Sequence, residues 1–460
     1  MKGHITVFLC LIMTVTCSLV YTIVEGCQMQ ALKWKMEVRT ELDTNYVLSY
    51  YDTMLHEKYG LFFLSGMDSK NLSNLLADCS EESGKRQADS SDYLGMEITD
   101  IVVDKVLLAT DENGRPFFDQ AVKEEYQYLG EDVSSLVEDF LSWTNLLEKA
   151  DKKEAEGEEI KNQEVEIDPE TKIDKAEKKK AEKLTNPADV AEELKEDQNE
   201  CWFGDASVSK KKVKTSTSLT KRKKAKGNLT YGAEKSTSQI DNVLFLSYLM
   251  RHFATYNEPN EEGALSYEIE YILKGKNSDK KNIESVAMDI LAIREACNFL
   301  YLISNQEMKQ QAGVLATALT GYLGNVAITK VTEYLILFAW AGAEGVLDVK
   351  NLLQGEAVPL MKNVDTWQLS LTGMTDTSSI MGERKEAEDG LVYDDYLKML
   401  LYSSGRQKLI WRAMDVMEWE IQRITDNTDF KMDKCVGGFQ TTYQFESRGQ
   451  DFVYEKITGY

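Results

Sequence analysis

ITVFLCLIMTVTCSLVYTIV, residues Ile5 to Val24, decides how the rest of this chain is organised. The stretch has no charged residue and is bounded by Lys2 and Glu25. A helix of about twenty residues spans about 30 Å, the hydrocarbon thickness of a bilayer. Its threonines and serine can hydrogen-bond to carbonyls of their own helix, so they are compatible with lipid. We therefore predict a retained anchor that contacts the lipid bilayer through Ile5 to Val24.

Two other interpretations of this segment stay open. A cleaved secretory signal needs a basic leader, a shorter apolar core and a small-residue cleavage site. Here the leader holds one lysine, the apolar run is long, and no Ala-x-Ala site follows. Val24-Glu25-Gly26-Cys27 is a poor version of a lipoprotein cleavage box, which would place a lipid on Cys27.

Composition narrows the classes of function. The 460 residues carry a net charge of -24, which argues against nucleic acid as a partner. The three histidines and seven cysteines are scattered, without any Cys-x-x-Cys pair, so we expect no metal site and no cofactor. For Cys297 and Cys435 a bridge is conceivable, but two buried free thiols are the simpler expectation.

The helical pattern continues past the anchor. Apolar residues recur every fourth position, and a second row runs beside the first, which predicts one helix of about fifty residues that ends at Tyr59-Gly60. The first row is Val38, Leu42, Tyr46, Tyr50 and Met54, and the second is Val47, Tyr51 and Leu55. We expect both rows to pack against the core of a domain rather than to hold a cofactor.

The remaining patterns mix helices with a few strands that do not alternate strictly, which predicts an α+β domain. The expected organisation is a transmembrane anchor over 1–24, a stalk helix over 25–60, an α+β domain over 61–147 and 236–460, and a charged disordered insertion over 148–235. The insertion is predicted from its Lys, Glu and Asp content, which leaves too little apolar surface to offset chain entropy.

Strands are expected where apolar residues alternate with polar ones. They cover Met96 to Thr110 with a bulge, the YEIEYIL run from Tyr267 to Leu273, and three segments of the tail, 430–436, 439–446 and 451–457, with a turn at Gly437-Gly438. The expected helices are 72–76, 116–147, 241–256, 282–304, 348–355, 396–402 and 407–425, with a loop over 81–92 and an acidic turn at 111–114.

Ala312 to Ala343 contains two apolar runs, of which the second includes Glu333. Both are short for a membrane span, so we expect buried core helices, and a second span is the alternative.

The insertion ends in a basic tract, KKKVKTSTSLTKRKKAK, from Lys210 to Lys226. It holds nine lysines and arginines without an acid, a composition typical of contact with a polyanion or with lipid headgroups. The candidate contact residues are Lys210, Lys211, Lys212, Lys221, Arg222, Lys223 and Lys224. The competing expectation, which we favour, is a solvated loop partly neutralised by the acidic stretch before it.

No phosphate loop, dinucleotide fingerprint, nucleophile elbow or zinc-protease motif occurs in the sequence. Carboxylates are abundant, but no pair stands out. Asp394 and Asp395 are explained at least as well by the cap of a helix as by catalysis. We therefore expect no catalytic residue and a protein that is not an enzyme.

Several phrases resemble an uncharacterised family of membrane proteins from Gram-positive bacteria, whose genes lie near those for tight-adherence (Tad) pilus assembly. The resemblance covers nearly the whole chain except 148–235, and the family has no established activity. The similar phrases are GHITVFL from Gly3, Glu25-Gly26, KYGLFF from Lys58, LLATD from Leu107, YEIEYILKG from Tyr267, Ile293-Arg294-Glu295 with Asn298, and YDDYL from Tyr393.

The start of the chain is also similar, more loosely, to pilin-like proteins of the TadE/TadG kind, in which Gly3 would be the processing point. Those proteins carry a glutamate shortly after the cut, whereas this chain continues as Ile5-Thr6-Val7-Phe8-Leu9. The resemblance implies a single-pass protein of the bacterial cell membrane with most of the chain outside the cytoplasm. It would be a pseudopilin-like, non-catalytic component of a Tad-type pilus or secretion system, with protein partners in the envelope. The alternative is a membrane-tethered enzyme or binding module acting on anionic cell-wall polymer.

Overall fold

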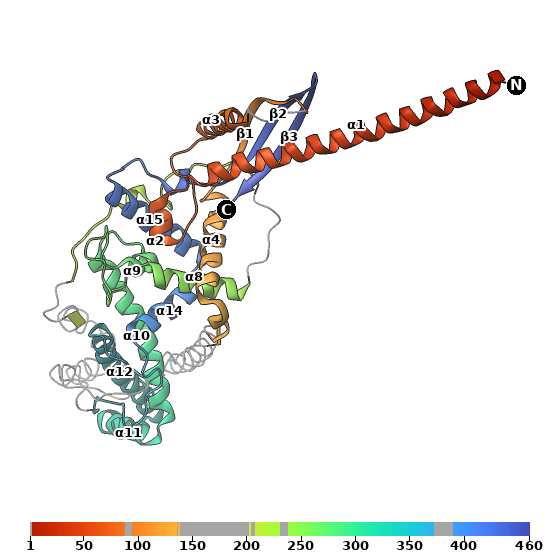
Figure 1. Cartoon of the computed structure of the whole chain (residues 1–460). Coiled ribbons are helices and arrows are strands. Elements are labelled where there is room, and N and C mark those ends of the chain that lie inside the picture. Colours follow the sequence, from red (N-terminus) through yellow and green to blue (C-terminus); the bar gives the residue numbers. More distant parts are fainter. Residues whose placement is uncertain are drawn as a thin grey trace. The chain divides into compact units, whose positions relative to one another are not determined.

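The computed structural model describes residues 2–87, 94–135, 137–138, 202–203, 208–230, 238–371 and 390–460. They belong to two compact units, each assembled from separate stretches of chain. The first unit comprises Met1–Ala121, Lys223–Lys235 and Ile421–Tyr460, and the second comprises Val122–Arg222 and Ser236–Glu420. Helices are mixed with one small antiparallel sheet, which confirms the α+β class (Figure 1). Most of the predicted insertion over 148–235 lies outside the described residues, which resume at 202–203 and 208–230.

The first unit begins with α1 (Lys2–Leu48), the long helix drawn in red in Figure 1. Hydroxyls inside its apolar segment donate to carbonyls one turn back, as expected: Thr16 to Ile12 at 2.9 Å and Thr22 to Ser18 at 2.8 Å. The expected single helix to Tyr59 is wrong in one respect, because α1 ends at Leu48 and α2 (Thr53–Tyr59) starts anew. Asp52 caps α2, since its side chain accepts from the amide of Leu55 at 3.0 Å.

Gly60 ends α2 in the left-handed region, at φ 65°, as the Tyr59-Gly60 pair predicts. The run that follows is buried at Leu61, Phe63 and Leu64. Helix α3 (Ser69–Gln87) is much longer than the expected segment 72–76, and it occupies most of the segment expected to be a loop.

The sheet contains β1 (Met96–Leu108), β2 (Val436–Ser447) and β3 (Gln450–Gly459), with β2 in the centre and both pairs antiparallel. The expected bulge in β1 is confirmed by register shifts, the first between Ile98 and Asp100. The expected turn at Gly437-Gly438 is wrong, because both glycines lie inside β2. Chain reversal instead takes place at Arg448 and Gly449, which have φ values of 52° and 76°.

Gly437 and Gly438 are needed for close packing rather than for a turn. A Cβ at Gly437 would lie 3.0 Å from the ring of Phe63, and one at Gly438 would lie 3.0 Å from a β3 carbonyl. The predicted strand over 430–436 is also wrong: the segment contains a 3-10 turn, Met432–Lys434, before β2 begins. Burial of Met432 and Cys435 in the core produces the apolar pattern that suggested a strand.

One side of α1 helps to form the core of the first unit. Leu32, Met36 and Val47 are buried against residues of α3 and of the sheet. The latter include Leu72 and Leu76 of α3 and Tyr443 and Phe445 of β2. The acidic turn after β1 is the start of α4 (Asp111–Leu129), where Glu112, Asn113 and Gly114 have positive φ; the 3-10 turn Gly130–Asp132 follows α4.

The second unit is helical in its described part. Its elements are α8 (Gln239–His252), α9 (Glu268–Lys274), α10 (Asp279–Ser304), α11 (Gln306–Thr320), α12 (Val326–Leu353), α14 (Tyr393–Ser403) and α15 (Arg406–Thr425), with short 3-10 turns at Thr215–Thr217 and Gly321–Leu323. The helices expected near α8, α10, α14 and α15 are confirmed. Ile424 at the end of α15 is 43% exposed.

The YEIEYIL segment is the clearest error of the sequence interpretation, because it forms helix α9 and not a strand. Every residue from Glu268 to Leu273 is buried, so the alternation of charged and apolar residues does not mark an inner and an outer face. Both glutamate carboxylates accept hydrogen bonds from backbone amides in the segment that follows α8. Glu268 accepts from the amide of Ala254 at 3.0 Å, and Glu270 accepts from that of Tyr256 at 2.9 Å.

Helix α12 is one helix of 28 residues, so the separate helix expected over 348–355 is wrong. Both α1 and α12 are long and apolar enough to cross a membrane. They differ in burial. None of the most apolar segment of α1 is buried, whereas 39% of the corresponding segment of α12 is buried within the protein.

Candidate functional site

The part of α1 beyond the apolar segment presents large apolar side chains to the outside. Trp34 is 67% exposed, Leu42 58%, Tyr46 48% and Tyr50 46%. They follow one another at intervals of four or eight residues, so they wind gradually round α1, and Tyr50 lies just beyond its end at Leu48. We call Trp34, Val38, Leu42, Tyr46 and Tyr50 the outer stripe. The expectation that the first row of apolar residues packs into the core is wrong for Leu42, Tyr46 and Tyr50.

The second row behaves as expected, since Val47 and Leu55 are fully buried. The two rows therefore differ in burial: the second includes fully buried residues, whereas the first is exposed at Leu42, Tyr46 and Tyr50 and half-buried at Val38 and Met54. Periodicity alone could not separate them, because both rows fit a helical spacing.

The outer stripe continues the apolar surface of the anchor. Phe8 and Leu19 in the segment from Ile5 to Val24 are 63% and 60% exposed. The same helix runs without interruption from Lys2 to Leu48, and exposed apolar residues recur on it from Trp34 onward, past the predicted edge of the lipid.

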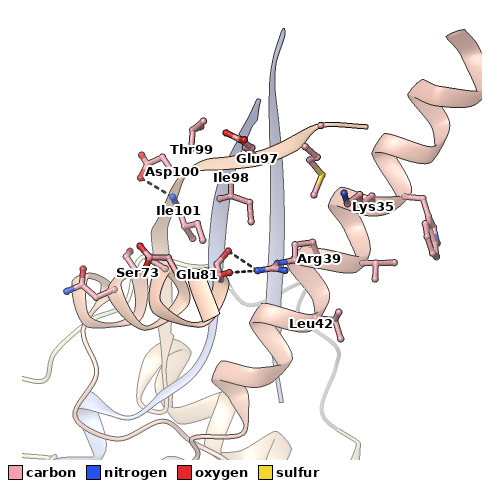
Figure 2. Close-up of a pocket in the computed structure, with 17 residues that line it drawn as sticks. Lys35, Arg39, Leu42, Ser73, Glu81, Glu97, Ile98, Thr99, Asp100 and Ile101 are labelled. Atoms are coloured by element: carbon pink, nitrogen blue, oxygen red, sulfur yellow. Dashed lines mark hydrogen bonds between the residues drawn. The ribbon is translucent and has the colours of Figure 1, made fainter. Parts of the chain in front are cut away.

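A groove of about 1110 Å³ adjoins the stripe (Figure 2). Its walls come from three elements of the first unit: Trp34 to Leu42 of α1, Ser73 to Glu81 of α3, and the start of the sheet from Gly95 to Ile101. The lining is half polar in character, with Lys35, Arg39 and Glu81 among its side chains.

Arg39 joins two walls of this groove. Its guanidinium forms an ion pair with Asp43 at 3.2 Å and donates to the backbone carbonyl of Ser80 on α3 at 2.5 Å. Figure 2 shows the Glu81 carboxylate pointing towards Arg39. Burial raises the pKa of Asp43, and the adjacent Arg39 opposes that rise. Arg39 is only 9% exposed, so it supports the groove more than it offers a contact.

The edge of β1 is protected by side chains rather than by another strand. Ser73 Oγ accepts from the amide of Val103 at 2.8 Å, and Asn228 Oδ1 accepts from that of Val106 at 2.9 Å. Asp100 Oδ1 also accepts from the amide of Ile101 at 2.9 Å. Such contacts discourage uncontrolled pairing of this edge with another chain.

The second unit contains a buried network of charges. Arg294 and Asp348 are both fully buried and form an ion pair at 3.0 Å, and Lys362 pairs with Asp348 at 2.6 Å and with Glu344. Asn298 donates to Asp348 at 3.0 Å. Burial alone raises the pKa of Asp348, but Lys362 and Arg294 outweigh it and hold this pKa below its ordinary value. Two cations balance two anions, which is the arrangement of a structural network.

Sequence interpretation missed this network. Glu344 and Asp348 stand four residues apart in an apolar helix, which was the available signal. Arg294 and Asn298 were noted only as part of a family resemblance, and Lys362 was not singled out at all.

A second group of acids surrounds Glu270. Its carboxylate accepts from the hydroxyl of Tyr393 at 2.8 Å, and burial raises its pKa to about 7. Asp394 is half-buried and its pKa is also raised by burial, whereas Asp395 accepts from the amide of Val392 at 3.2 Å at the start of α14. The cap interpretation of Asp395 is thus supported. Glu270 is fully buried, which denies a substrate access to its carboxylate.

The basic tract is not the solvated loop that we favoured from the sequence. Residues 208–230 are described, and backbone and side chains fasten them to the protein. In the second unit, Lys211 Nζ donates to three carbonyls, at 3.0 Å to Asn260, 2.6 Å to Glu261 and 2.9 Å to Gly263. Arg222 forms a two-pronged pair with Glu418 at 2.5 and 2.7 Å.

The other candidate contact residues point outward to different degrees. Lys210, Lys212, Lys221 and Lys223 are exposed, and Lys224 is half-buried. Lys211 and Arg222 are therefore structural, while their exposed neighbours remain candidates for a polyanion.

The processing and modification candidates lie on α1 or are thiols. Gly3 is in the first turn of α1, and Cys27 is a free and exposed thiol on the same helix. Cys297 and Cys435 are free and buried, as expected. Within the described ranges, no group of three or more His, Cys, Asp or Glu side chains is placed to hold a metal ion.

Comparison with known proteins places the chain in a family. Residues 177–447, more than half of the chain, match the model of a family of unknown function, DUF5702. No curated protein and no solved structure matches the chain. The protein is therefore a member of the DUF5702 family of unknown function.

Proposed function

We propose that this protein is a single-pass, membrane-anchored component of the bacterial cell envelope that works by assembly with other subunits and not by catalysis. The anchor is Ile5 to Val24, and the bulk of the chain lies outside the cytoplasm. The resemblance noted in the sequence suggests a pseudopilin-like role in a Tad-type pilus or secretion system, with Gly3 as the processing point.

The observation that carries this proposal is that α1 exposes large apolar side chains both in the anchor and again at Trp34, Leu42 and Tyr46. Large exposed apolar patches on a soluble surface are typical of interaction sites. Lipid accounts for Ile5 to Val24, but it cannot cover Leu42 and Tyr46, which lie 18 or more residues further on. At a rise of about 1.5 Å per residue that distance is about 27 Å or more. A neighbouring subunit anchored in the same membrane can cover the outer stripe and continue into the groove beside it.

Cross-linking in membranes tests the assembly. In a background without Cys10, Cys17 and Cys27, a Leu42→Cys variant should form disulfide-linked species between copies on mild oxidation. The matched control is Glu37→Cys, an exposed α1 position about 140° away around the helix. Equal cross-linking of the two variants, or none in either, would contradict assembly of copies through the outer stripe.

Protease treatment of intact cells tests the orientation separately. We expect degradation of the chain beyond about residue 30, because the proposal places that part outside the cytoplasm. Protection of the domain in intact cells, with digestion after lysis, would refute the external location.

The alternative is a membrane-tethered enzyme or binding module that acts on anionic cell-wall polymer. The enzyme form lacks support from Glu270 and Asp395, which are respectively buried and engaged in a cap. The binding form is favoured by one specific observation, the ordered row of exposed lysines in the basic tract.

A further inference from the structure

We infer that Lys210, Lys212 and Lys214, with Lys281, form a binding site for a linear phosphodiester polymer. These four lysines are exposed and belong to the second unit. We call them the lysine row. The inference is independent of assembly through α1, because it depends on a different unit and different side chains.

The backbone beneath the row is fixed by contacts on its inner side. The hydroxyl of Ser209 donates to the buried carboxylate of Asp279 at 2.6 Å, and the amide of Val213 donates to the carbonyl of Asn277 at 3.1 Å. Lys212 and Ser278 form an antiparallel bridge. Farther along, the amide of Leu219 donates to Asp415 at 2.7 Å, with Leu219 fully buried.

This attachment sorts the side chains into two sets. Lys211 and Val213 face the protein and are half-buried, whereas Lys210, Lys212 and Lys214 alternate with them and are exposed. In extended backbone, residues two apart lie on one side at about 6.6–6.8 Å. The bridge between Lys212 and Ser278 brings Lys281, in the first turn of α10, to the same region.

The row is not neutralised by the described part of the protein. None of its four ammonium groups forms an ion pair or hydrogen bond with a described residue. Among the acids near the row, Asp279 is buried and accepts from Ser209 and from the amide of Ser266, and Glu284 pairs with Lys280 at 3.7 Å. Glu261 and Glu262 are exposed beside Lys211, which donates to the carbonyl of Glu261.

The chain as a whole is acidic, with a net charge of -24, but that charge does not cancel the row. The Debye length is about 8 Å at physiological ionic strength, so acids farther away are screened. Several exposed lysines on fixed backbone suit a flexible chain of repeating phosphates better than one compact anion. Lysine binds phosphate as a point charge and needs no particular orientation of the group.

The test measures binding of synthetic poly(glycerol phosphate) to the full-length protein in neutral detergent, across a range of salt concentrations. Release of counterions from a single-stranded polyanion gives a log–log salt slope of about −0.7 per phosphate contact. Three to four contacts therefore predict a loss of affinity of about twenty- to fiftyfold between 50 and 200 mM salt. The triple variant Lys210→Gln, Lys212→Gln, Lys214→Gln should lose most of the affinity and of the salt slope.

Two variants separate the site from net charge and from folding. Lys105→Gln, Lys123→Gln and Lys408→Gln together remove the same charge from exposed lysines elsewhere and should bind as the wild type does. Replacement of the row by arginine should retain binding, which shows that charge at these positions is what matters. Equal affinity of the glutamine row variant and its control would overturn the inference.

Lipid headgroups carry the same phosphate chemistry and are tested in parallel. Vesicles of phosphatidylglycerol should compete with the polymer only weakly, because their phosphates lie on a surface and not along a chain. Competition by vesicles as strong as that by the polymer, at equal phosphate concentration, would refute a polymer site.

Discussion

The two units depart from the usual distribution of residues in opposite ways. The first exposes Trp34, Leu42 and Tyr46 on α1, whereas the second buries Arg294 and Asp348 completely. Apolar surface left outside calls for cover from something other than the unit itself. Charges left inside are balanced within the unit, cation against anion. Under the function proposed above, lipid and a neighbouring subunit cover the exposed apolar surface of the first unit, whereas the network around Arg294 and Asp348 is balanced within the second.

The largest expected effect comes from breaking the internal balance of the second unit. Asp348→Ala leaves Arg294 without its ion pair and Lys362 with Glu344 alone. Loss of one member of a buried network typically costs about 3–5 kcal/mol in the free energy of unfolding. Denaturant unfolding measures it. The control is Lys330→Ala, which removes an ion pair with Glu333 from a lysine side chain that is 47% exposed and should cost at most about 1 kcal/mol. Equal losses of unfolding free energy in both variants would show that the buried network stabilises the second unit no more than an exposed ion pair does.

The two sides of α1 provide the next contrast. Met36 is 4% exposed and lies in the core, so Met36→Ala should destabilise the first unit by about 2–5 kcal/mol. Leu42→Ala should change the stability of the isolated protein by no more than about 0.5 kcal/mol, since Leu42 is 58% exposed. Thermal unfolding in detergent compares them. A large loss for Leu42→Ala would show that the outer stripe is covered by the protein itself.

The pH dependence of stability tests another kind of buried charge. Burial raises the pKa of Glu270 from 4.5 to about 7, so the folded state holds a proton that the unfolded state releases between these values. Stability contributed by this proton is present below about pH 4.5 and is lost as pH rises through 7, by at most about 3 kcal/mol. Asp415, with a pKa raised by burial to about 6, acts in the same direction.

Glu270→Gln removes the titration and should flatten, though not abolish, the fall in stability between pH 5 and pH 8. The midpoint of denaturant unfolding at both pH values measures the slope. The control is Glu307→Gln, an exposed α11 position that should keep the wild-type slope. An unchanged slope in Glu270→Gln would place the proton on another group.

These contrasts also show what could be predicted from the sequence. Most of the long helix, the bulged strand from Met96, and the Gly60 stop were predicted because each depends on local spacing and turn chemistry. Helix α9 was predicted as a strand because alternating polar and apolar residues were taken to face solvent and core in turn. Glu268 and Glu270 are in fact buried, so no solvent-facing side exists here. Their partners, the amides of Ala254 and Tyr256, lie 14 residues away and leave no local signal.

The candidate sites divide in the same way. Composition located the basic tract, but only tertiary contacts distinguish the inward Lys211 and Arg222 from the exposed lysines. Arg294 and Asp348 are 54 residues apart, and nothing in their local sequence pairs them. Periodicity likewise identified two apolar rows on the first helix without indicating which row the domain would cover.

The smallest expected effect concerns hydroxyl groups on the outer stripe. The hydroxyls of Tyr46 and Tyr50 lie 2.9 Å apart, and their exposed edge-to-face rings have centroids 5.4 Å apart. Tyr46→Phe keeps the ring contact and removes a hydrogen bond that water can replace, so stability should change by less than about 0.5 kcal/mol. Tyr393→Phe removes a buried donor to Glu270 and should cost about 1–3 kcal/mol. If Tyr46→Phe lowered stability as much as Tyr393→Phe, the Tyr46 hydroxyl would be buried within the isolated protein. The outer stripe would then not be free to receive a partner.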